Sequence, residues 1–387
     1  MSDRGPSLER GRGVNGVPED SLTVRFLEEE HQMSDEVAGW LASFLAKAGE
    51  TLDLAMYDVR LSETPARLLR EALVERAAAG VRIRLAYDAG DKPQTPQEVE
   101  RSGVDPTPPG THERVEELGL PAPSIRAIKG PRELMHHKYV VRDRSAVWTG
   151  SLNLSDDSMR RMENLIVTLE SQPLAAAYGH DFEQLWQRGI IEGSGEGRVD
   201  AVPLVYGGEG ALTTAAFSPG RGMEINEDVA LQISEARRRI VICSMLLTSS
   251  RILRAFNEQL DRGQIEIWGV YDETQMRGVL DQWQERPELA WKIAAFERLV
   301  WESRLVGKQS RPYRPDDIHD FMHNKTLVID DTVLTGSHNF SHSAETNAEN
   351  MVAIQSPRLA VDVVRYVQGL AERYGAGRQD RRHGGHS

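Results

Sequence analysis

The sequence of 387 residues has very little cysteine and no long apolar run. Its single cysteine, Cys243, excludes an internal disulfide and lies in "IVICSML", a run typical of a buried strand. No uncharged apolar segment approaches the roughly 20 residues that span a bilayer. The first twenty residues also lack the apolar centre of a signal peptide. The sequence therefore predicts a soluble, cytoplasmic protein.

Positive charge is also scarce, because 46 Lys and Arg face 59 Asp and Glu and leave a formal net charge of −13. Binding to nucleic acid through overall charge depends on neutralising phosphates with Lys and Arg, so this balance argues against a general nucleic-acid coat. A local basic groove is still compatible with it. With 40% hydrophobic and 27% charged residues, the chain can form one large globular domain or two of ordinary size.

The two halves of the sequence follow one plan. Residues 34–88 predict a helix, the strand "TLDLAMYDV", a helix that ends at Gly80 and the strand "VRIRLAYD". The second half repeats this order with a helix around "VALQISEARR", the strand "IVICSML", a helix that ends at Gly263 and the strand "IEIWGVYD". Strands that alternate with helices indicate βαβ units, an α/β fold and a parallel sheet.

A polar motif also occurs twice, as "LMHHKYVVRDRSAVWTGSLN" from residue 134 and as "FMHNKTLVIDDTVLTGSHN" from residue 321. On a strand, residues two apart share a face, which pairs His136 with Lys138 and His323 with Lys325. His137 then points away from His136, so the two histidines do not form a metal pair. The sequence predicts no metal site and no cofactor.

An imidazole beside an ammonium group suits an anionic phosphorus centre. The ammonium attracts the oxyanion, and the imidazole nitrogen attacks or transfers a proton. The Gly-Ser-x-Asn turn that follows each pair offers close backbone approach and short polar donors for phosphate oxygens. These turns contain Gly150, Ser151, Asn153, Gly336, Ser337 and Asn339. One copy is an anion cradle, whereas two copies supply an acid and a base.

These motifs make the sequence similar to the phospholipase D superfamily, whose mark is H-x-K-x4-D followed by G-S-x-N. Both copies are complete, and the stretch from Asp to Gly is one residue shorter in the second. The resemblance extends over nearly all of residues 20–375. The matching residues are His136, Lys138, Asp143, Gly150, Ser151 and Asn153, and again His323, Lys325, Asp330, Gly336, Ser337 and Asn339.

The resemblance implies two pseudo-symmetric βαβ sandwich lobes packed around one shared active site. It implies a metal-independent phosphodiesterase in which His136 forms a phosphohistidine and His323 serves as general acid and base. In this family the lysines, asparagines and serines of the motifs stabilise or bind the phosphate. A paired acid and base predicts a bell-shaped dependence of rate on pH.

Two further pairs of acidic residues accompany the motifs. Glu163 and Glu349 lie the same distance beyond Asn153 and Asn339, and a carboxylate beside each catalytic histidine would fix its tautomer. Family resemblance supports that role. Asp143 and Asp330 each end a strand, where an Asp more often holds its own turn than touches a substrate, so we interpret them with the motif glycines as structural.

The domain prediction has five parts. They are a disordered N-terminus at 1–20, a first lobe at 21–195, a Gly-rich linker at 196–211, a second lobe at 212–375 and a disordered tail at 376–387. The Pro-rich segment 93–112 is an exposed loop or a cap over the site. Internal duplication already provides both lobes, so we expect a monomer without an obligate protein partner.

The substrate class is less constrained. The leading prediction is hydrolysis or transfer of phospholipid headgroups with transient membrane-surface contact; the alternatives are an endonuclease and a noncatalytic phosphate-binding module. The loops before each motif are locally basic and would form either a positive mouth over the site or solvated loops. Three tryptophans of the second half would line a lipid-facing or base-stacking wall or, as the apolar spacing around them favours, pack in the core. The basic residues are Arg126, Lys129, Arg132, Lys308, Arg311 and Arg314, and the tryptophans are Trp283, Trp291 and Trp301.

Overall fold

The computed structural model describes residues 20–89, 111–130, 132–314 and 317–383, with side chains described as far as residue 376. The predicted disordered N-terminus lies, apart from Asp20, outside these residues, as does most of the Pro-rich segment 93–112. In the described part of the chain, no helix is long and apolar enough to cross a membrane.

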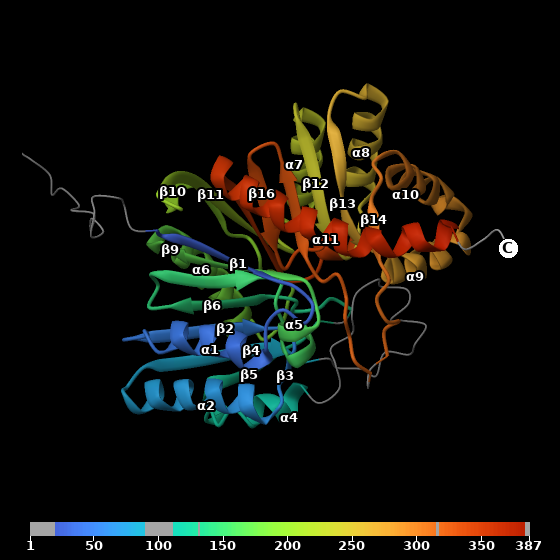
Figure 1. The fold of residues 1–387 in the computed structure, drawn as a ribbon. Helices are drawn as coiled ribbons and strands as arrows, with labels where there is room; N and C mark the ends of the chain where they lie inside the picture. Colours follow the sequence, from blue (N-terminus) through green and yellow to red (C-terminus); the bar gives the residue numbers. More distant parts are fainter. Residues whose placement is uncertain (1–19, 90–110, 131, 315–316, 384–387) are drawn as a thin grey trace, which may run out of the picture.

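Two large sheets form the centre of the molecule (Figure 1). The first has seven strands in the order β1-β9-β7-β6-β2-β4-β5, and the second has eight in the order β10-β11-β17-β16-β15-β12-β13-β14. The strands of the first sheet are β1 (Leu22–Leu27), β2 (Thr51–Met56), β4 (Arg82–Asp88), β5 (Ile125–Ile128), β6 (Lys138–Arg142), β7 (Ala146–Gly150) and β9 (Asn164–Glu170). Those of the second are β10 (Arg198–Tyr206), β11 (Glu209–Ser218), β12 (Arg239–Ser244), β13 (Glu266–Asp272), β14 (Val306–Lys308), β15 (Lys325–Ile329), β16 (Thr332–Gly336) and β17 (Glu349–Gln355). A short pair, β3 (Val59–Arg60) and β8 (Leu154–Ser155), lies apart from both.

The α/β class and the two similar lobes are as predicted, but the sheets are mixed rather than parallel. β2, β4 and β5 pair in parallel, as do β12, β13 and β14, whereas the motif strands β6 and β15 run antiparallel to β2 and β12. Each motif strand also forms a tight antiparallel hairpin with the next strand. The hairpin turn has three residues after Arg142 and two after Ile329, which accounts for the shorter stretch from Asp to Gly in the second copy.

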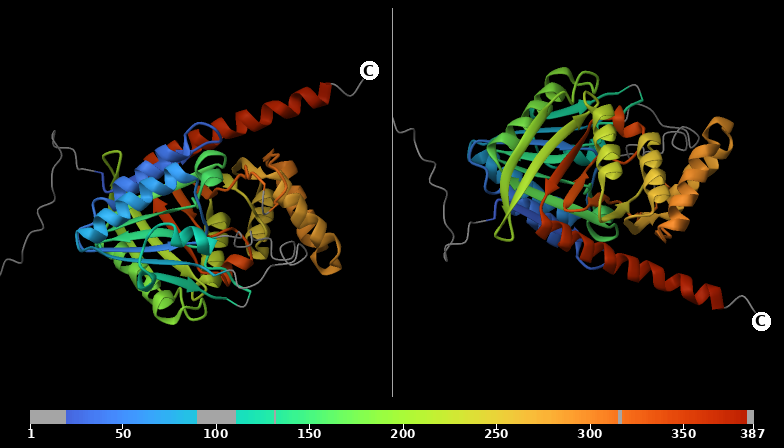
Figure 2. Two further views of the ribbon diagram at one scale, coloured as in Figure 1. Left: turned by 90° about the horizontal axis from the view of Figure 1, so that it is seen from below. Right: turned by 90° about the horizontal axis from the view of Figure 1, so that it is seen from above.

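Helices cover both faces of each sheet. Two apolar clusters fill the outer layers, and a third lies between the sheets. The outer helices are α1 (Ser34–Leu45) and α2 (Glu63–Ala78) on the first lobe, and α7 (Gly222–Glu235) and α8 (Ser250–Arg262) on the second. The inner helices are α6 (Gln172–Arg188) and α11 (Pro357–His383), whose apolar residues belong to the shared central cluster. Figure 2 shows the far half of α11 extending past the rest of the molecule.

The motif strands are buried on both faces because helices cover both sides of each sheet. On β6, Tyr139 and Val141 belong to the central cluster, whereas Val140 packs in the outer one. On β15, Val328 faces the centre and Leu327 faces the outer layer. This alternation places His137 and Asn324, which directly precede the strands, on the side of the central cluster, where they contact Asp181 of α6 and Tyr366 of α11. His136 and His323, with their lysines, have the opposite parity.

The tryptophan-bearing insertion of the second lobe forms α9 (Glu273–Gln284), a short 3-10 turn at Pro287–Leu289 and α10 (Ala290–Glu302). Trp283 is 8% exposed and packs in the outer core, but Trp301 is 80% exposed. Core packing is therefore the right interpretation for Trp283 and the wrong one for Trp301. A further short helix, α4 (Thr111–Glu116), lies at the edge of the first lobe.

The predicted linker at 196–211 is instead strand β10 and the start of β11. Its glycines form a two-residue hairpin turn, with positive φ at both Gly207 and Gly208, and such Gly-Gly turns match the twist of paired strands. Val205 of β10 also exchanges hydrogen bonds with Ser21, beside β1 of the other lobe. The predicted tail is likewise not wholly irregular, because α11 continues as far as His383.

Candidate active site

The two motif segments meet where the lobes face each other, and main-chain hydrogen bonds join the first of them to the second lobe. The His136 N–H donates to the Ala348 carbonyl at 2.9 Å, and the Ala348 N–H donates to the Leu134 carbonyl at 2.9 Å. Met135 and Ala348 thereby form a parallel bridge between the lobes. The first histidine is fixed directly against the strand that contributes Glu349.

A buried aspartate holds each motif segment from behind. Asp88 Oδ1 accepts from the Met135 N–H at 2.7 Å, and Asp272 Oδ2 accepts from the Met322 N–H at 2.9 Å. Burial raises the pKa of Asp272 to about 6, against hydrogen bonds that favour the charged form, among them that from Ser310. Our sequence interpretation missed both aspartates, although the signal is present: β4 and β13 each end in Tyr-Asp.

His136 is oriented by a carboxylate from the other lobe. Its Nδ1 lies 2.7 Å from Glu349 Oε2, and both side chains are buried. Burial raises the pKa of Glu349 to about 8, while Lys138 and Lys325 oppose that rise. The prediction that Glu349 lies beside a catalytic histidine agrees with this geometry, and the contact crosses between lobes.

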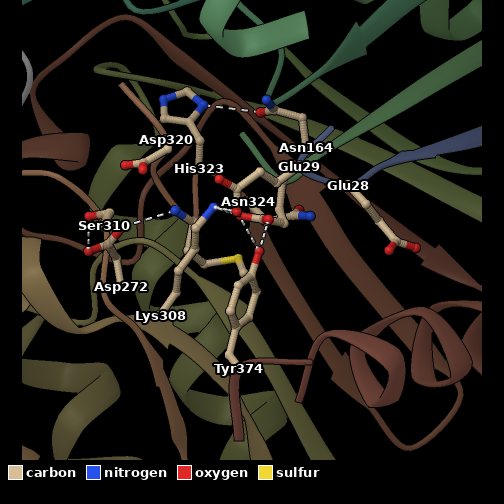
Figure 3. A network of polar contacts seen from close by, with 12 residues as sticks. Glu28, Glu29, Asn164, Asp272, Lys308, Ser310, Asp320, His323, Asn324 and Tyr374 are labelled. Atoms are coloured by element: carbon tan, nitrogen blue, oxygen red, sulfur yellow. Dashed lines mark hydrogen bonds and ion pairs between the residues drawn. The ribbon is translucent and has the colours of Figure 1, made fainter. Parts of the chain in front are cut away.

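His323 is oriented by an amide. Its Nδ1 lies 3.1 Å from Asn164 Oδ1, again across the lobe boundary (Figure 3). Asn164 was not among the predicted site residues. It begins β9 as Glu349 begins β17, so the two residues occupy equivalent positions.

Glu163, which the sequence placed beside a catalytic histidine, lies in a different network. Its carboxylate bonds to Lys308 Nζ at 2.7 Å and to the hydroxyl of Tyr374. The prediction that Glu163 lies beside a catalytic histidine is wrong by one residue, because Asn164 holds that position beside His323. Gly150 pairs with Ile166 but Gly336 pairs with Met351, so the loop between turn and strand is one residue longer in the first lobe. That loop contains the helix α5 (Asp156–Arg160), where the second lobe has a single 3-10 turn at Ser343–Glu345.

Two buried lysines place positive charge at the site. The Lys138 ammonium donates to the His136 carbonyl, and that of Lys325 donates to the His323 carbonyl, each at 2.8 Å. Burial, followed by the charges of both lysines, holds the pKa of His136 well below its ordinary value. The same causes hold the pKa of His323 well below its ordinary value. Because each lysine acts on both histidines, the four side chains form one electrostatic unit.

In the motif turns, the serines have structural contacts and the asparagines are left for the site. The hydroxyl of Ser151 accepts from the Leu165 N–H at 3.1 Å and donates to Asn164 Oδ1 at 2.7 Å, and Ser337 accepts from the Asn350 N–H at 3.0 Å. Both serines therefore support the orienting residues, rather than presenting a free hydroxyl to a phosphate as the sequence predicted. Asn153 and Asn339 are buried side chains whose amide oxygens have no hydrogen-bond partner within the described residues.

Asp143 and Asp330 lie at the opposite ends of the motif strands from the histidines. Asp143 accepts hydrogen bonds from the backbone N–H groups of residues 49–51 at 2.7–2.9 Å, and Asp330 accepts from those of residues 237–239 at 2.8–3.2 Å. Partial burial opposes it, but these backbone donors lower the pKa of both carboxyls. The aspartates thus hold the loops that lead into β2 and β12.

The positive mouth expected from the basic loops is largely neutralised in the second lobe. Lys308 is only 3% exposed and pairs with Glu163 and with Glu29 at 3.3 Å. Arg311 lies within 4 Å of two aspartates of its own loop. Within the described residues there is also no group of three or more His, Cys, Asp or Glu arranged to hold a metal ion.

Comparison with known proteins identifies the family. The family model described as "Cardiolipin synthase, PLD-like domain" matches residues 41–186 and again 229–371, once in each lobe. The chain belongs to the phospholipase D superfamily. Members of this superfamily are phosphodiesterases or enzymes that modify phospholipids. No curated protein sequence matches the chain.

Two solved structures show the same fold at low identity. The phosphatidylserine synthase of Haemophilus influenzae Rd KW20 superposes with a TM-score of 0.61 at 13% identity, covering 91% of this chain and 86% of that one. The polyphosphate kinase of Porphyromonas gingivalis superposes with a TM-score of 0.54 at 12% identity, covering 95% of this chain and 50% of that one. These similarities support the arrangement of two lobes around one junction.

Proposed function

We propose that the protein is a metal-independent phosphodiesterase that hydrolyses or transfers phospholipid headgroups through a covalent phosphohistidine. One observation carries the proposal: each motif histidine has its Nδ1 held by a residue of the opposite lobe, beside two buried lysines. The proposal assigns the chemistry to the Nε2 atom of each ring. Two imidazoles at one cationic junction are what a two-step phosphoryl transfer needs.

In the first step, the lone pair of His136 Nε2 attacks phosphorus, and the bond from phosphorus to the leaving alcohol oxygen breaks. His323, protonated in the substrate complex where the phosphodiester anion offsets the charge of the two lysines, gives its Nε2 proton to that oxygen. In the second step, neutral His323 takes a proton from water or from an acceptor alcohol, whose oxygen attacks phosphorus as the N–P bond breaks. His136 is thereby released neutral, and His323 is protonated again.

The surrounding groups stabilise the charge on phosphorus. Lys138 and Lys325 are buried at the junction, where a fixed positive charge interacts more strongly with an oxyanion than it would in water. The amides of Asn153 and Asn339 supply neutral donors from both lobes. Because Lys308 and Arg311 of the second lobe already pair with carboxylates, recognition of a long polyanion receives little support from them.

The choice of a lipid substrate rests on three supports. The net charge of −13 disfavours general nucleic-acid binding. The family model that matches is described by the name of cardiolipin synthase, and one structural relative is a phosphatidylserine synthase, although those names concern those proteins. The exposed Trp301 also provides an amphipathic ring of the kind that lies at membrane surfaces.

The test of substrate class uses purified protein in EDTA with mixed phospholipid vesicles and, separately, with single- and double-stranded DNA and RNA. The proposal expects released headgroup and intact nucleic acid. Cleaved nucleic acid with intact lipid would establish the nuclease alternative, and phosphate binding without any turnover would establish the noncatalytic one.

The histidine roles are tested with bis(p-nitrophenyl) phosphate, whose leaving group departs without a general acid. We expect His323→Asn to accumulate a phospho-adduct and His136→Asn to form none. His180→Asn, a substitution on the exposed side of α6, is the matched control and should behave as wild type. An adduct that persists in His136→Asn would reverse the assignment.

A further inference from the structure

The two half-sites differ at one buried position. Asn164 begins β9 and Glu349 begins β17, and each contacts the Nδ1 atom of the histidine from the other lobe. Both residues are fully buried. One histidine therefore faces a carboxylate, and the other faces an uncharged amide.

The hydrogen bonds around Asn164 fix which way its amide points. Its Nδ2 lies 2.8 Å from the backbone carbonyl of Ser158, which can only accept, so the nitrogen must be on that side. Oδ1 therefore faces His323, and it also accepts from the hydroxyl of Ser151 at 2.7 Å. Because an amide oxygen cannot donate, the proton of this contact must belong to His323 Nδ1. The neutral ring then has its lone pair on Nε2.

We propose that Asn164 is a positioning residue that fixes His323 as its Nδ1–H tautomer and keeps this histidine a stronger acid than a carboxylate partner would allow. The proposal rests on the proposed function, and it explains why His323 serves as the acid and His136 as the nucleophile. It also names a residue that neither the motifs nor the acidic spacing indicates.

The asymmetry suits the chemistry of each histidine. A general acid starts as an imidazolium and ends neutral, so a carboxylate partner would stabilise the reactant more than the product and oppose proton transfer. An amide orients the ring without that penalty. A nucleophile starts neutral and gains positive charge as the N–P bond forms, so a carboxylate such as Glu349 stabilises its transition state.

Glu163, the adjacent carboxylate, is not available for this task. Lys308 and Tyr374 occupy both of its oxygens. The chain therefore carries Glu-Asn where β9 begins, with the carboxylate directed to a structural network and the amide directed to the site.

The test measures His323 itself by NMR of protein labelled with ¹⁵N-histidine, with the signal assigned from its loss in His323→Asn. In the wild type we expect the Nδ1–H tautomer. Asn164→Asp should raise the midpoint of the His323 titration by about one pH unit or more, and should move the corresponding limb of the pH-rate profile by the same amount. Asn164→Ala, which introduces no charge beside the Ser158 carbonyl, should instead allow both tautomers and leave the midpoint without an upward shift.

Glu163→Gln is the matched control, since it changes a carboxylate to an amide one residue away, and it should not raise the His323 midpoint. An Nε2–H tautomer in the wild type, or a midpoint that stays in place in Asn164→Asp, would overturn the inference. A second readout is kinetic: Asn164→Ala should lose up to about 100-fold in rate with alkyl leaving groups but little with p-nitrophenyl ones. An equal loss with both would count against a role in proton donation. Failure of turnover with every phosphodiester would refute the proposed function while the NMR titration still decides the role of Asn164.

Discussion

Replacing Lys308 with Met should expose the energetic role of the network beside the active site. Lys308, on β14 of the second lobe, bonds to Glu163 at 2.7 Å and to Glu29 at 3.3 Å, both from the first lobe. Tyr374 of α11 completes the network through its hydroxyl. The substitution retains an apolar side chain of similar length and removes only the charge.

The expected cost is about 3–5 kcal/mol, which is the usual penalty for leaving one member of a buried ion pair without its partner. The cost is larger than that of a surface ion pair because Glu163 is fully buried and Lys308 is 3% exposed. Replacing both charges, as Lys308→Met with Glu163→Gln, should recover a large part of this loss. The pair therefore predicts strong non-additivity in a double-mutant cycle.

The loss should also depend on pH, with a defined sign. Burial raises the pKa of Glu163, and Lys308 opposes that rise, so removing the lysine raises the pKa further. A carboxyl whose pKa is higher in the folded than in the unfolded state stabilises the fold at low pH, and this stabilisation disappears as pH rises through the folded pKa. Lys308→Met should accordingly be most destabilised near neutral pH and recover as the pH falls toward the ordinary range of a glutamic acid.

Chemical denaturation at several pH values, followed by circular dichroism, measures these effects. Arg311→Met, in the segment that follows β14, is the matched control, because Arg311 is exposed and its ion pairs should contribute less than about 1 kcal/mol. If Lys308→Met were as stable as that control, or if its loss were the same at every pH, the argument for a buried interlobe pair would be refuted.

Three further predictions concern other parts of the chain. Asp143→Ala removes the acceptor of three backbone N–H groups and should lower the free energy of unfolding in urea by about 1–2 kcal/mol. These donors outweigh partial burial and lower the pKa of Asp143, so the loss should be present above pH 4 and shrink as the pH falls through the folded pKa. Gly336→Ala places a Cβ 2.3 Å from the Asn350 carbonyl at a φ of +147°, so we expect a loss of about 3 kcal/mol or more, with reduced expression of soluble protein as the first sign. Trp301→Ser should change stability by less than about 0.5 kcal/mol, whereas Trp283→Ala should cost about 3–5 kcal/mol, and thermal melts that show equal effects would contradict the assigned burial.

Much of the fold was predictable because it is repeated. The same order of apolar strands and helices occurs in both halves, with a glycine after the second helix of each, and specifies two α/β lobes. The mixed sheets were not predicted, since the direction of β6 and β15 depends on pairing with β2 and β12 across a long insertion. The Gly-Gly turn at 207–208 was mistaken for part of a linker, because the strands beside it alternate too weakly to indicate an edge hairpin.

Site residues were predictable where a strand fixes their spacing in the sequence, and not where a loop of variable length lies between them. Lys138 and Lys325 follow their histidines on a strand, so their positions transfer directly. Glu163 and Glu349 lie beyond loops of different length, and equal counting placed Glu163 one residue away from the position that matters. Only the pairing of β9 with β7 shows that Asn164 is the counterpart of Glu349.

The difference between Asn164 and Glu349 has a consequence for how such an enzyme is specialised. An active site shared across a twofold homodimer must carry the same residue at both symmetry-related positions, so its two histidines start with identical surroundings. In a single chain with both lobes, each position is encoded separately, and a substitution near one imidazole leaves the other untouched. The covalent duplication thus permits the two sides of the active site to differ in the free protein, so that the leaving group and the incoming acceptor meet different surroundings.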